Sequence, residues 1–331
     1  MQQDKPIKIV SVGKYLPQQV ESKELEAKHG LPVGWSSRYS GVETRHMVTT
    51  ECNGEMGAKA ADNALKKVNM TLSDIQMIIS AGSSYDYSVP NQASIIKSKM
   101  EHGLKFDTPA IDIDSTCLSF VSALDFASKI LDGLAYKNIL IVSSEIPSIA
   151  INPENWETLT LFGDAAAAII VSYDELSESR YIKGDQKTYS EGVYHTIIEG
   201  GGIKNSFKNN PYNADLYSFK MQGKKLLRLA KNKIPEFFEN FYKNSIYNMD
   251  NIDVLIPHQA SKSGIVILNK LYKFRPGSVK MTLHKYGNCV AASIPLTLID
   301  AIESGEVKRG DICLLFGTSA GFAIGAVLLK Y

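Results

Sequence analysis

Residues 74–79 read Asp-Ile-Gln-Met-Ile-Ile, and a similar stretch, Asn-Ile-Asp-Val-Leu-Ile, returns at residues 251–256. Each stretch is followed by Gln-Ala-Ser, at residues 92–94 in the first case and 259–261 in the second. Similar segments that recur in the same order indicate one supersecondary unit used twice. The sequence therefore predicts two related halves.

Short apolar runs alternate along the chain with amphipathic stretches. The predicted buried strands are Ile7–Val12, Met77–Ser80, Ile139–Ser143, Ala168–Val171, Val254–Ile256 and Ile312–Phe316. The predicted helices are Glu55–Val68, Ser119–Leu131, Leu226–Phe241 and Ile294–Ile302. Continuous apolar strands separated by amphipathic helices are typical of an α/β fold with a sheet covered on both faces. We place the boundary between the two halves at residues 175 and 176, which gives the ranges 1–175 and 176–331.

The composition excludes several classes of protein. The 331 residues include 36 Lys and Arg against 35 Asp and Glu, a formal net charge of +1, and 44% of the residues are hydrophobic. A nucleic-acid-binding protein normally carries a basic excess, and a disordered chain is poor in apolar residues. The most apolar internal stretch, Ala165–Val171, is too short to span a membrane, and no secretory signal is visible. The four dispersed cysteines show no metal-binding spacing, so we expect a cytoplasmic protein with reduced thiols and no metal.

Cys117 is the candidate nucleophile. It lies in a strand-turn-helix pattern over residues 111–120, so its sulfur should lie at or near a helix amino terminus. The unpaired N–H groups and the helix dipole favour the thiolate there, and a thiolate can attack an acyl thioester. The alternative is a buried, inert cysteine, which suits Cys289 and Cys313 in their apolar surroundings.

Two polar residues of the second half are candidate partners of Cys117. His258 directly follows a predicted strand, where α/β folds place groups that face a ligand. Asn288 opens a predicted helix as Cys117 does, so we expect it to be the counterpart of Cys117 in the repeat and to donate a hydrogen bond to a carbonyl oxygen. An ordinary buried histidine and an ordinary helix cap are the structural alternatives.

A glycine-rich turn is expected after the last predicted strand. Its residues Gly317, Ser319 and Gly321 would bring backbone N–H groups close to a substrate and complete an oxyanion hole beside the N–H of Cys117.

Together these residues resemble a known family. The motifs that carry the resemblance are Ser115-Thr116-Cys117, Phe162-Gly163-Asp164, Met221-Gln222-Gly223, Pro257-His258-Gln259-Ala260, Tyr286-Gly287-Asn288 with Ser293-Ile294-Pro295, and Trp35 followed by Gly41-Val42-Glu43-Thr44-Arg45. In this order they resemble the 3-oxoacyl-[acyl-carrier-protein] synthase III family of the thiolase superfamily. The resemblance implies a duplicated five-layer α-β-α-β-α fold, a homodimer, and a catalytic triad of Cys117, His258 and Asn288.

The same resemblance implies a reaction and its substrates. Cys117 would take an acyl group from a coenzyme A or phosphopantetheine thioester, with Trp35 and Arg38 binding the substrate. His258 and Asn288 would then stabilise the enolate formed when a malonyl thioester loses carbon dioxide, and the enolate would attack the acyl group. No metal or redox cofactor is implied, and the expected partners are acyl-coenzyme A and an acyl carrier protein.

Departures from the family pattern lie around the donor site. Leu118-Ser119 replaces the usual pair of small residues after the cysteine, and no arginine occurs in the stretch Ser261–Gly264 that follows His258. Tyr39 stands where the arginine of the tryptophan motif would align, which leaves Arg38 displaced by one position. We therefore expect a specialised member, from a secondary-metabolite or unusual acyl-chain pathway. A basic stretch over residues 220–233 is either a solvated helix face or a surface for an acidic carrier.

Three other functions are considered. A papain-like cysteine hydrolase would also carry Cys, His and Asn in this order, but its cysteine lies near the amino terminus in a different sequence context. An acyltransferase of the same superfamily could move the acyl group from Cys117 to a hydroxyl or amine, with His258 as general base. A non-catalytic subunit could keep the fold, but an intact triad argues against it.

Overall fold

The computed structural model describes residues 4–206, 208 and 213–331, and its core is built on two sheets. The first sheet has the strand order β1-β7-β6-β4-β5. Its strands are β1 (Ile7–Tyr15), β7 (Ala165–Tyr173), β6 (Asn138–Glu145), β4 (Met77–Ala81) and β5 (Ala110–Ile113). The second sheet has the order β11-β12-β13-β8. Its strands are β11 (Val254–Pro257), β12 (Ile312–Ser319), β13 (Ala323–Lys330) and β8 (Arg180–Thr188).

The two sheets share one topology. In the first, β4 and β6 are parallel, whereas β7 is antiparallel to both β6 and β1. In the second, β11 and β12 are parallel, and β13 is antiparallel to both β12 and β8. All six strands predicted from the sequence are present, and the duplicated α/β architecture is confirmed.

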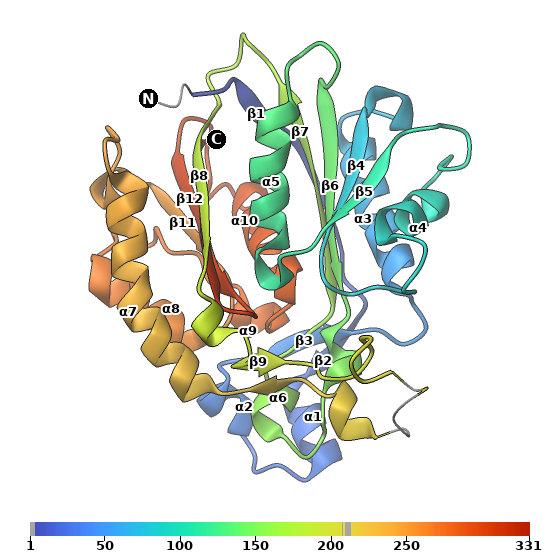
Figure 1. Cartoon of the computed structure of the whole chain (residues 1–331), viewed down its shortest axis with the longest axis vertical. Coiled ribbons are helices and arrows are strands. Elements are labelled where there is room, and N and C mark those ends of the chain that lie inside the picture. The colour runs from blue at the N-terminus through green and yellow to red at the C-terminus, as the bar shows by residue number, and fades with distance from the viewer. Residues whose placement is uncertain (1–3, 207, 209–212) are drawn as a thin grey trace.

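Helices form three layers around the sheets. The helices between the two sheets are α5 (Ser119–Ile130) and α10 (Ser293–Glu303) (Figure 1). Outside the first sheet lie α3 (Asn53–Lys67) and α4 (Gln92–Lys99), and outside the second lie α7 (Gly223–Tyr242) and α8 (Lys262–Tyr272) (Figure 1). The expected five-layer α-β-α-β-α fold is therefore confirmed.

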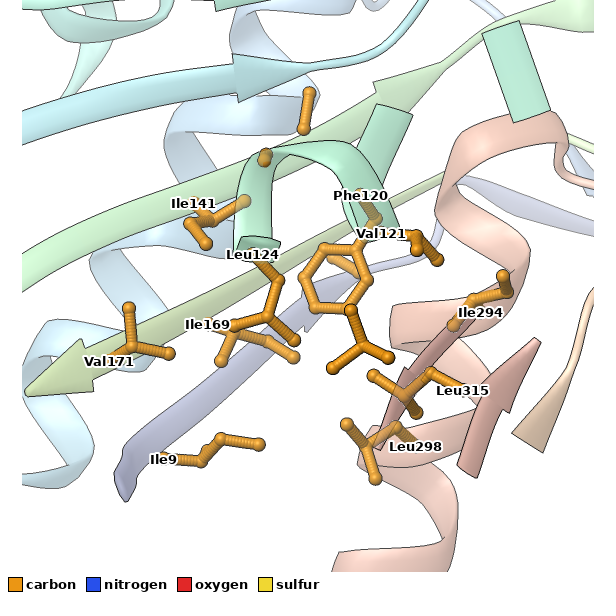
Figure 2. Packing of buried hydrophobic residues seen from close by; sticks show 14 of the residues in the cluster. Ile9, Phe120, Val121, Leu124, Ile141, Ile169, Val171, Ile294, Leu298 and Leu315 are labelled. Atoms are coloured by element: carbon orange, nitrogen blue, oxygen red, sulfur yellow. The ribbon is translucent and has the colours of Figure 1, made fainter. Parts of the chain in front are cut away.

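The core fills the space between the layers because each central helix presents apolar side chains toward both sheets. Phe120 and Leu124 of α5 are almost fully buried, as are Ile294 and Leu298 of α10. Figure 2 shows these side chains meeting others from both sheets, with the Phe120 ring near the centre of the cluster. Such helices are stable only between two apolar surfaces, so their sequence alone requires a central layer.

The remaining elements are short. They are β2 (Gln18–Glu21), α1 (Ser22–His29), α2 (Trp35–Tyr39), β3 (Thr44–Met47), α6 (Trp156–Leu159), β9 (Thr196–Ile197), β10 (Lys220–Met221) and α9 (Leu283–Tyr286). Short 3₁₀ helices are η1 (Leu72–Asp74), η2 (Thr116–Leu118), η3 (Pro147–Ala150), η4 (Ser190–Gly192), η5 (Ala214–Tyr217), η6 (Met249–Asn251) and η7 (Val290–Ala292). Most of the short helices and strands gather at one end of the two sheets, drawn at the bottom of Figure 1.

One expectation about the second sheet is wrong. β12 continues through Ser319, so Gly317 and Ser319 lie within a strand and only Gly321 lies in the turn that follows. β12 is also not the last strand, because β13 pairs with it along its whole length. The hairpin turn is shorter than expected because backbone pairing extends into the glycine-rich segment.

No helix within residues 4–206, 208 and 213–331 is long and apolar enough to cross a bilayer.

Candidate active site

Cys117 lies in a tight turn between β5 and α5. It is the middle residue of η2, and Thr116 before it has a left-handed backbone with φ of 51°. Asp114 holds this turn by accepting a hydrogen bond from the Thr116 N–H at 2.7 Å. Ser119 accepts a second bond from the Ser115 N–H at 2.9 Å and donates to the Thr116 carbonyl at 2.6 Å. The nucleophile is thus held by hydrogen bonds on both sides.

The same turn occurs in the second half. Val290 has φ of 48°, and its N–H donates to the Asn288 side-chain oxygen at 2.9 Å. Ser293 accepts from the Cys289 N–H at 2.9 Å, as Ser119 does from Ser115. The turn around Asn288 is therefore built like the turn around Cys117, and the two pack against each other where η2 meets η7.

This equivalence corrects the expected pairing of the repeat. The hydrogen bonds match Asn288 with Asp114, which caps the first turn in the same way. By the same register Cys117 corresponds to Ala291. The sequence pattern missed this because the register of a short turn is set by its capping bonds and not by apolar periodicity.

Asn288 is held by the backbone of the first half. Its N–H donates to the Leu161 carbonyl at 2.9 Å, and its carbonyl accepts from the Gly163 N–H at 3.2 Å. A Cβ on Gly163 would lie 2.2 Å from the Tyr286 carbonyl oxygen, so only glycine permits this close approach. The motifs around residues 162–164 and 286–288 therefore fit together. Because the side-chain oxygen of Asn288 accepts from the Val290 N–H, the group left on this side chain is its amide nitrogen, a hydrogen-bond donor.

His258 follows β11 and lies beside the Cys117 turn. Its N–H donates to the Phe316 carbonyl at 2.7 Å. A Cβ built on Gly317 would lie 2.8 Å from the His258 Cβ and 3.3 Å from the Leu118 side chain, so only the Gly317 backbone separates the two. The Nδ1 atom of His258 is buried and has no hydrogen-bond partner in the described part of the chain. Burial lowers the pKa of His258 to about 4, so its imidazole is neutral at physiological pH.

Backbone groups beyond β12 also approach Cys117. The N–H groups of Ala320 and of Cys117 itself both lower the pKa of the thiol. Thr116 Oγ1 donates to the Ala320 carbonyl at 3.4 Å, which fastens the two segments together. Ala320, which lies within the glycine-rich stretch from Gly317 to Gly321, is therefore a residue of this hairpin whose N–H acts on the sulfur.

The protonation state of Cys117 differs from the expectation. Burial, followed by repulsion from Glu145 and Asp114, raises the pKa of the thiol to about 12 despite the two N–H groups. The helix terminus was expected to favour the thiolate, but its effect is the smaller one in this half-buried, acidic setting. Cys117 is consequently a neutral thiol in the free protein.

Glu145 is a site residue that the sequence reasoning missed. It ends β6 and is fully buried, and burial raises the pKa of its carboxyl to about 7. A signal was present in the sequence, since a carboxylate two residues after the predicted strand Ile139–Ser143 is placed near the carboxyl end of a buried strand, where α/β folds build their sites.

Trp35 and Arg38 lie on α2, and the structure shows no contact between them and Cys117. The Trp35 ring stacks on Tyr39 at a centroid distance of 4.0 Å and meets Trp156 edge-on at 5.1 Å. Arg38 is exposed. A Cβ on Gly41 would lie 2.8 Å from the Lys262 side chain, so Lys262 reaches over from α8 to the end of α2. Lys262 thus brings a cation to this region that the sequence analysis did not assign.

The other cysteines have different surroundings. Cys289 and Cys313 are fully buried, and burial raises the pKa of both thiols, as expected for inert residues. Cys52 caps the start of α3. Among the described residues, no three His, Cys, Asp or Glu side chains are grouped so that they could hold a metal ion.

Comparison with known proteins identifies the family. A model described as 3-oxoacyl-[acyl-carrier-protein (ACP)] synthase III matches residues 111–190, and the model of its C-terminal part matches residues 243–331. A β-ketoacyl-[acyl-carrier-protein] synthase III from Rickettsia bellii is 32% identical over 98% of this chain and 99% of its own length. The chain belongs to the 3-oxoacyl-[acyl-carrier-protein] synthase III family.

Further members agree with this assignment. The synthase III of Campylobacter fetus is 32% identical over 99% of both chains. The crystal structure of 3-oxoacyl-[acyl-carrier-protein] synthase III from Aquifex aeolicus superposes with a TM-score of 0.88 at 27% identity, over 98% of this chain and 100% of the other. The protein is therefore an acyltransferase of the thiolase superfamily, and the papain-like hydrolase is excluded.

Proposed function

We propose that the protein condenses an acyl group with a malonyl thioester, with loss of carbon dioxide, to give a 3-oxoacyl thioester. Cys117 is the proposed nucleophile, and His258 and Asn288 are the proposed stabilisers of the enolate. The observation that carries this proposal is the state of Asn288, whose side-chain oxygen is occupied by the Val290 N–H so that its amide nitrogen is left to donate.

The first step is acylation of Cys117. The sulfur attacks the donor thioester, a new carbon–sulfur bond forms, and the bond to the donor sulfur breaks. Neutral His258 takes the thiol proton and returns it to the departing thiolate. The N–H groups of Cys117 and Ala320 suit the negative oxygen of the intermediate because both already act on the sulfur.

The second step is condensation. The malonyl carboxylate leaves as carbon dioxide, and its electron pair becomes an enolate held by the Asn288 amide and the His258 imidazole. The enolate carbon attacks the acyl group, a carbon–carbon bond forms, and the bond to Cys117 breaks. A neutral histidine suits this task because it can donate one N–H without adding a charge.

Intact-protein mass spectrometry with a panel of acyl thioesters tests the proposal. We expect a mass increase in the wild type and in Cys52→Ser, and none in Cys117→Ser. Cys52 is a suitable control because it is half-buried, as Cys117 is. Malonyl thioester should then discharge the adduct and yield a ketone. Discharge by an alcohol or an amine, but not by malonyl thioester, would instead support ester or amide formation.

We propose that the donor is carried by coenzyme A or by an acyl carrier protein, and that α7 forms the docking surface for the carrier. In the described part of the chain, the exposed Lys224, Lys225, Arg228 and Lys231 of α7 have no ion pair, whereas Lys220 pairs with Glu199 and Asp215. The substitution Arg228→Glu should raise KM for a carrier-bound donor and leave KM for the coenzyme A thioester unchanged.

We also propose that the chain acts as a homodimer built from two halves, 1–175 and 176–331. The support for dimerisation is β5, which forms one edge of the first sheet, and the exposed Tyr87 and Val89 in the loop before α4. An unpaired edge with apolar neighbours is suited to pairing with a second copy. A specialised donor site is also proposed. It is supported by the aromatic contacts of Trp35 with Tyr39 and Trp156, and by the lack of an arginine in the sequence stretch Ser261–Gly264.

A further inference from the structure

Glu145 is a buried carboxylate that hydrogen bonds link to the Cys117 turn. The proposed reaction does not use it. It accepts hydrogen bonds from the Ser83 N–H at 2.8 Å and from the Ser84 hydroxyl at 2.5 Å. Ser84 in turn accepts from the Ile146 N–H at 3.1 Å. These bonds tie the loop after β4 to the end of β6.

The same loop reaches the nucleophile turn. Tyr85 follows Ser84 and donates its hydroxyl to Asp114 at 3.1 Å. Asp114 holds the N–H of Thr116, the residue before Cys117, at 2.7 Å. A continuous path therefore runs from Glu145 through the loop to the turn that orients the sulfur. A Cβ on Gly82 would lie 3.1 Å from Glu145 Oε1, so the loop backbone closes tightly over the carboxylate.

Two acidic side chains act on the Cys117 thiol. In the described chain, the charged groups that act most strongly on Cys117 are Glu145 and Asp114, and both are acidic. Glu145 also acts on the titratable groups of Tyr85 and Cys289, which come from the loop after β4 and from the turn before η7. The carboxylate is thus surrounded by groups that a negative charge keeps protonated.

We propose that Glu145 is a positioning residue for Cys117, which anchors the loop that holds the nucleophile turn and brings a buried carboxylate into the same hydrogen-bonded network. The proposal rests on Cys117 as the nucleophile of the proposed function. It assigns Glu145 control over when the thiol becomes reactive, through two measurable effects. One is the geometry of the turn, and the other is the pH at which Cys117 reacts.

Alkylation of Cys117 by iodoacetamide tests the proposal without any acyl donor. The rate is followed on the peptide that carries Cys117 in the wild type and in Glu145→Gln, which keeps the shape and removes the charge. At about pH 6 the two rates should be similar, because the carboxyl of the wild type is then largely protonated. At about pH 8 the variant should react faster, by about tenfold for each unit by which loss of the Glu145 charge lowers the pKa of the thiol.

Matched variants separate charge from structure. Glu26→Gln also removes a buried carboxylate that accepts two backbone N–H bonds, from Gly34 and Ser36, and should react as the wild type does at both pH values. A rate ratio for Glu145→Gln that does not change between the two pH values would overturn the proposal. If Glu145→Gln does not fold, Ser84→Ala is the second variant. It keeps the carboxylate but removes a hydrogen bond that lowers the pKa of Glu145. The slowing of alkylation seen in the wild type should therefore begin at a higher pH. An unchanged pH profile in Ser84→Ala would equally overturn it. If no thioester acylates the protein while these profiles hold, only the proposed function fails.

Discussion

At the scale of single residues, Gly317 sets the position of His258. A Cβ there would lie 2.8 Å from the His258 Cβ, so Gly317→Ala must push the histidine away. We expect condensation to fall on the order of 10²-fold, since displacements of about 1 Å have that effect on catalysis. The check is single-turnover condensation on pre-acylated protein. Gly202→Ala, at a position with no atom within 4 Å of the added Cβ, should leave the rate unchanged.

The raised pKa of Glu145 also predicts a pH-dependent stability. Its pKa is about 7 in the folded protein against an ordinary value of 4.5, so between these values the folded state holds a proton that the unfolded chain has lost. The contribution of Glu145 to the free energy of unfolding is therefore highest below about pH 4.5. It falls as the pH rises from there through 7, because the unfolded chain gives up this proton more readily. Glu145→Gln lacks this loss, so its free energy of unfolding relative to wild type should increase by about 3 kcal/mol between about pH 4.5 and pH 8.

Urea unfolding at the two pH values measures that difference. His258 has the opposite dependence, because its lowered pKa makes stability fall as the pH falls from 6.5 towards 4. This contribution is present in both proteins and cancels in the comparison. A difference between variant and wild type that stays constant with pH would contradict the prediction.

At the scale of elements, the two 3₁₀ turns make a matched pair for mutagenesis. Ser119→Ala removes the acceptor of the Ser115 N–H and should slow acylation of Cys117. Ser293→Ala removes the acceptor of the Cys289 N–H next to Asn288 and should slow condensation while leaving acylation intact. Each should also lower the free energy of unfolding by about 1–3 kcal/mol, because a buried donor loses its partner. If both variants affected the same step, the assignment of one step to each turn would be wrong.

At the scale of the whole molecule, the exposed loop before α4 should govern assembly. Tyr87 and Val89 are 66% and 84% exposed in the single chain, beside the free edge of β5. The double variant Tyr87→Glu, Val89→Glu should dissociate the proposed dimer, which light scattering after gel filtration would detect. Ile246→Glu changes an equally exposed apolar residue elsewhere and should not. A monomeric wild type would contradict the proposal.

The layered fold could be predicted because apolar runs such as Ile139–Ser143 are stable only when they are buried between other elements. The register of the repeat could not, since Asn288 and Asp114 are matched by capping bonds within turns. The position of Glu145 at the end of a strand could be predicted, but its hydrogen-bond partners could not, because Ser83 and Ser84 lie more than sixty positions away along the chain. Periodicity reports burial, whereas such long-range bonds depend on the finished fold.

The duplicated turn described above has a consequence for how substrates are received. Cys117 and Asn288 are held on backbones of the same design, each turn contacting the sheet of the other half and each packed against the other. The fold therefore fixes the orientation of these two residues relative to each other before a substrate binds. We expect binding to require little reorganisation of these two groups, so that the electrostatic environment of the transition state is already assembled in the empty enzyme.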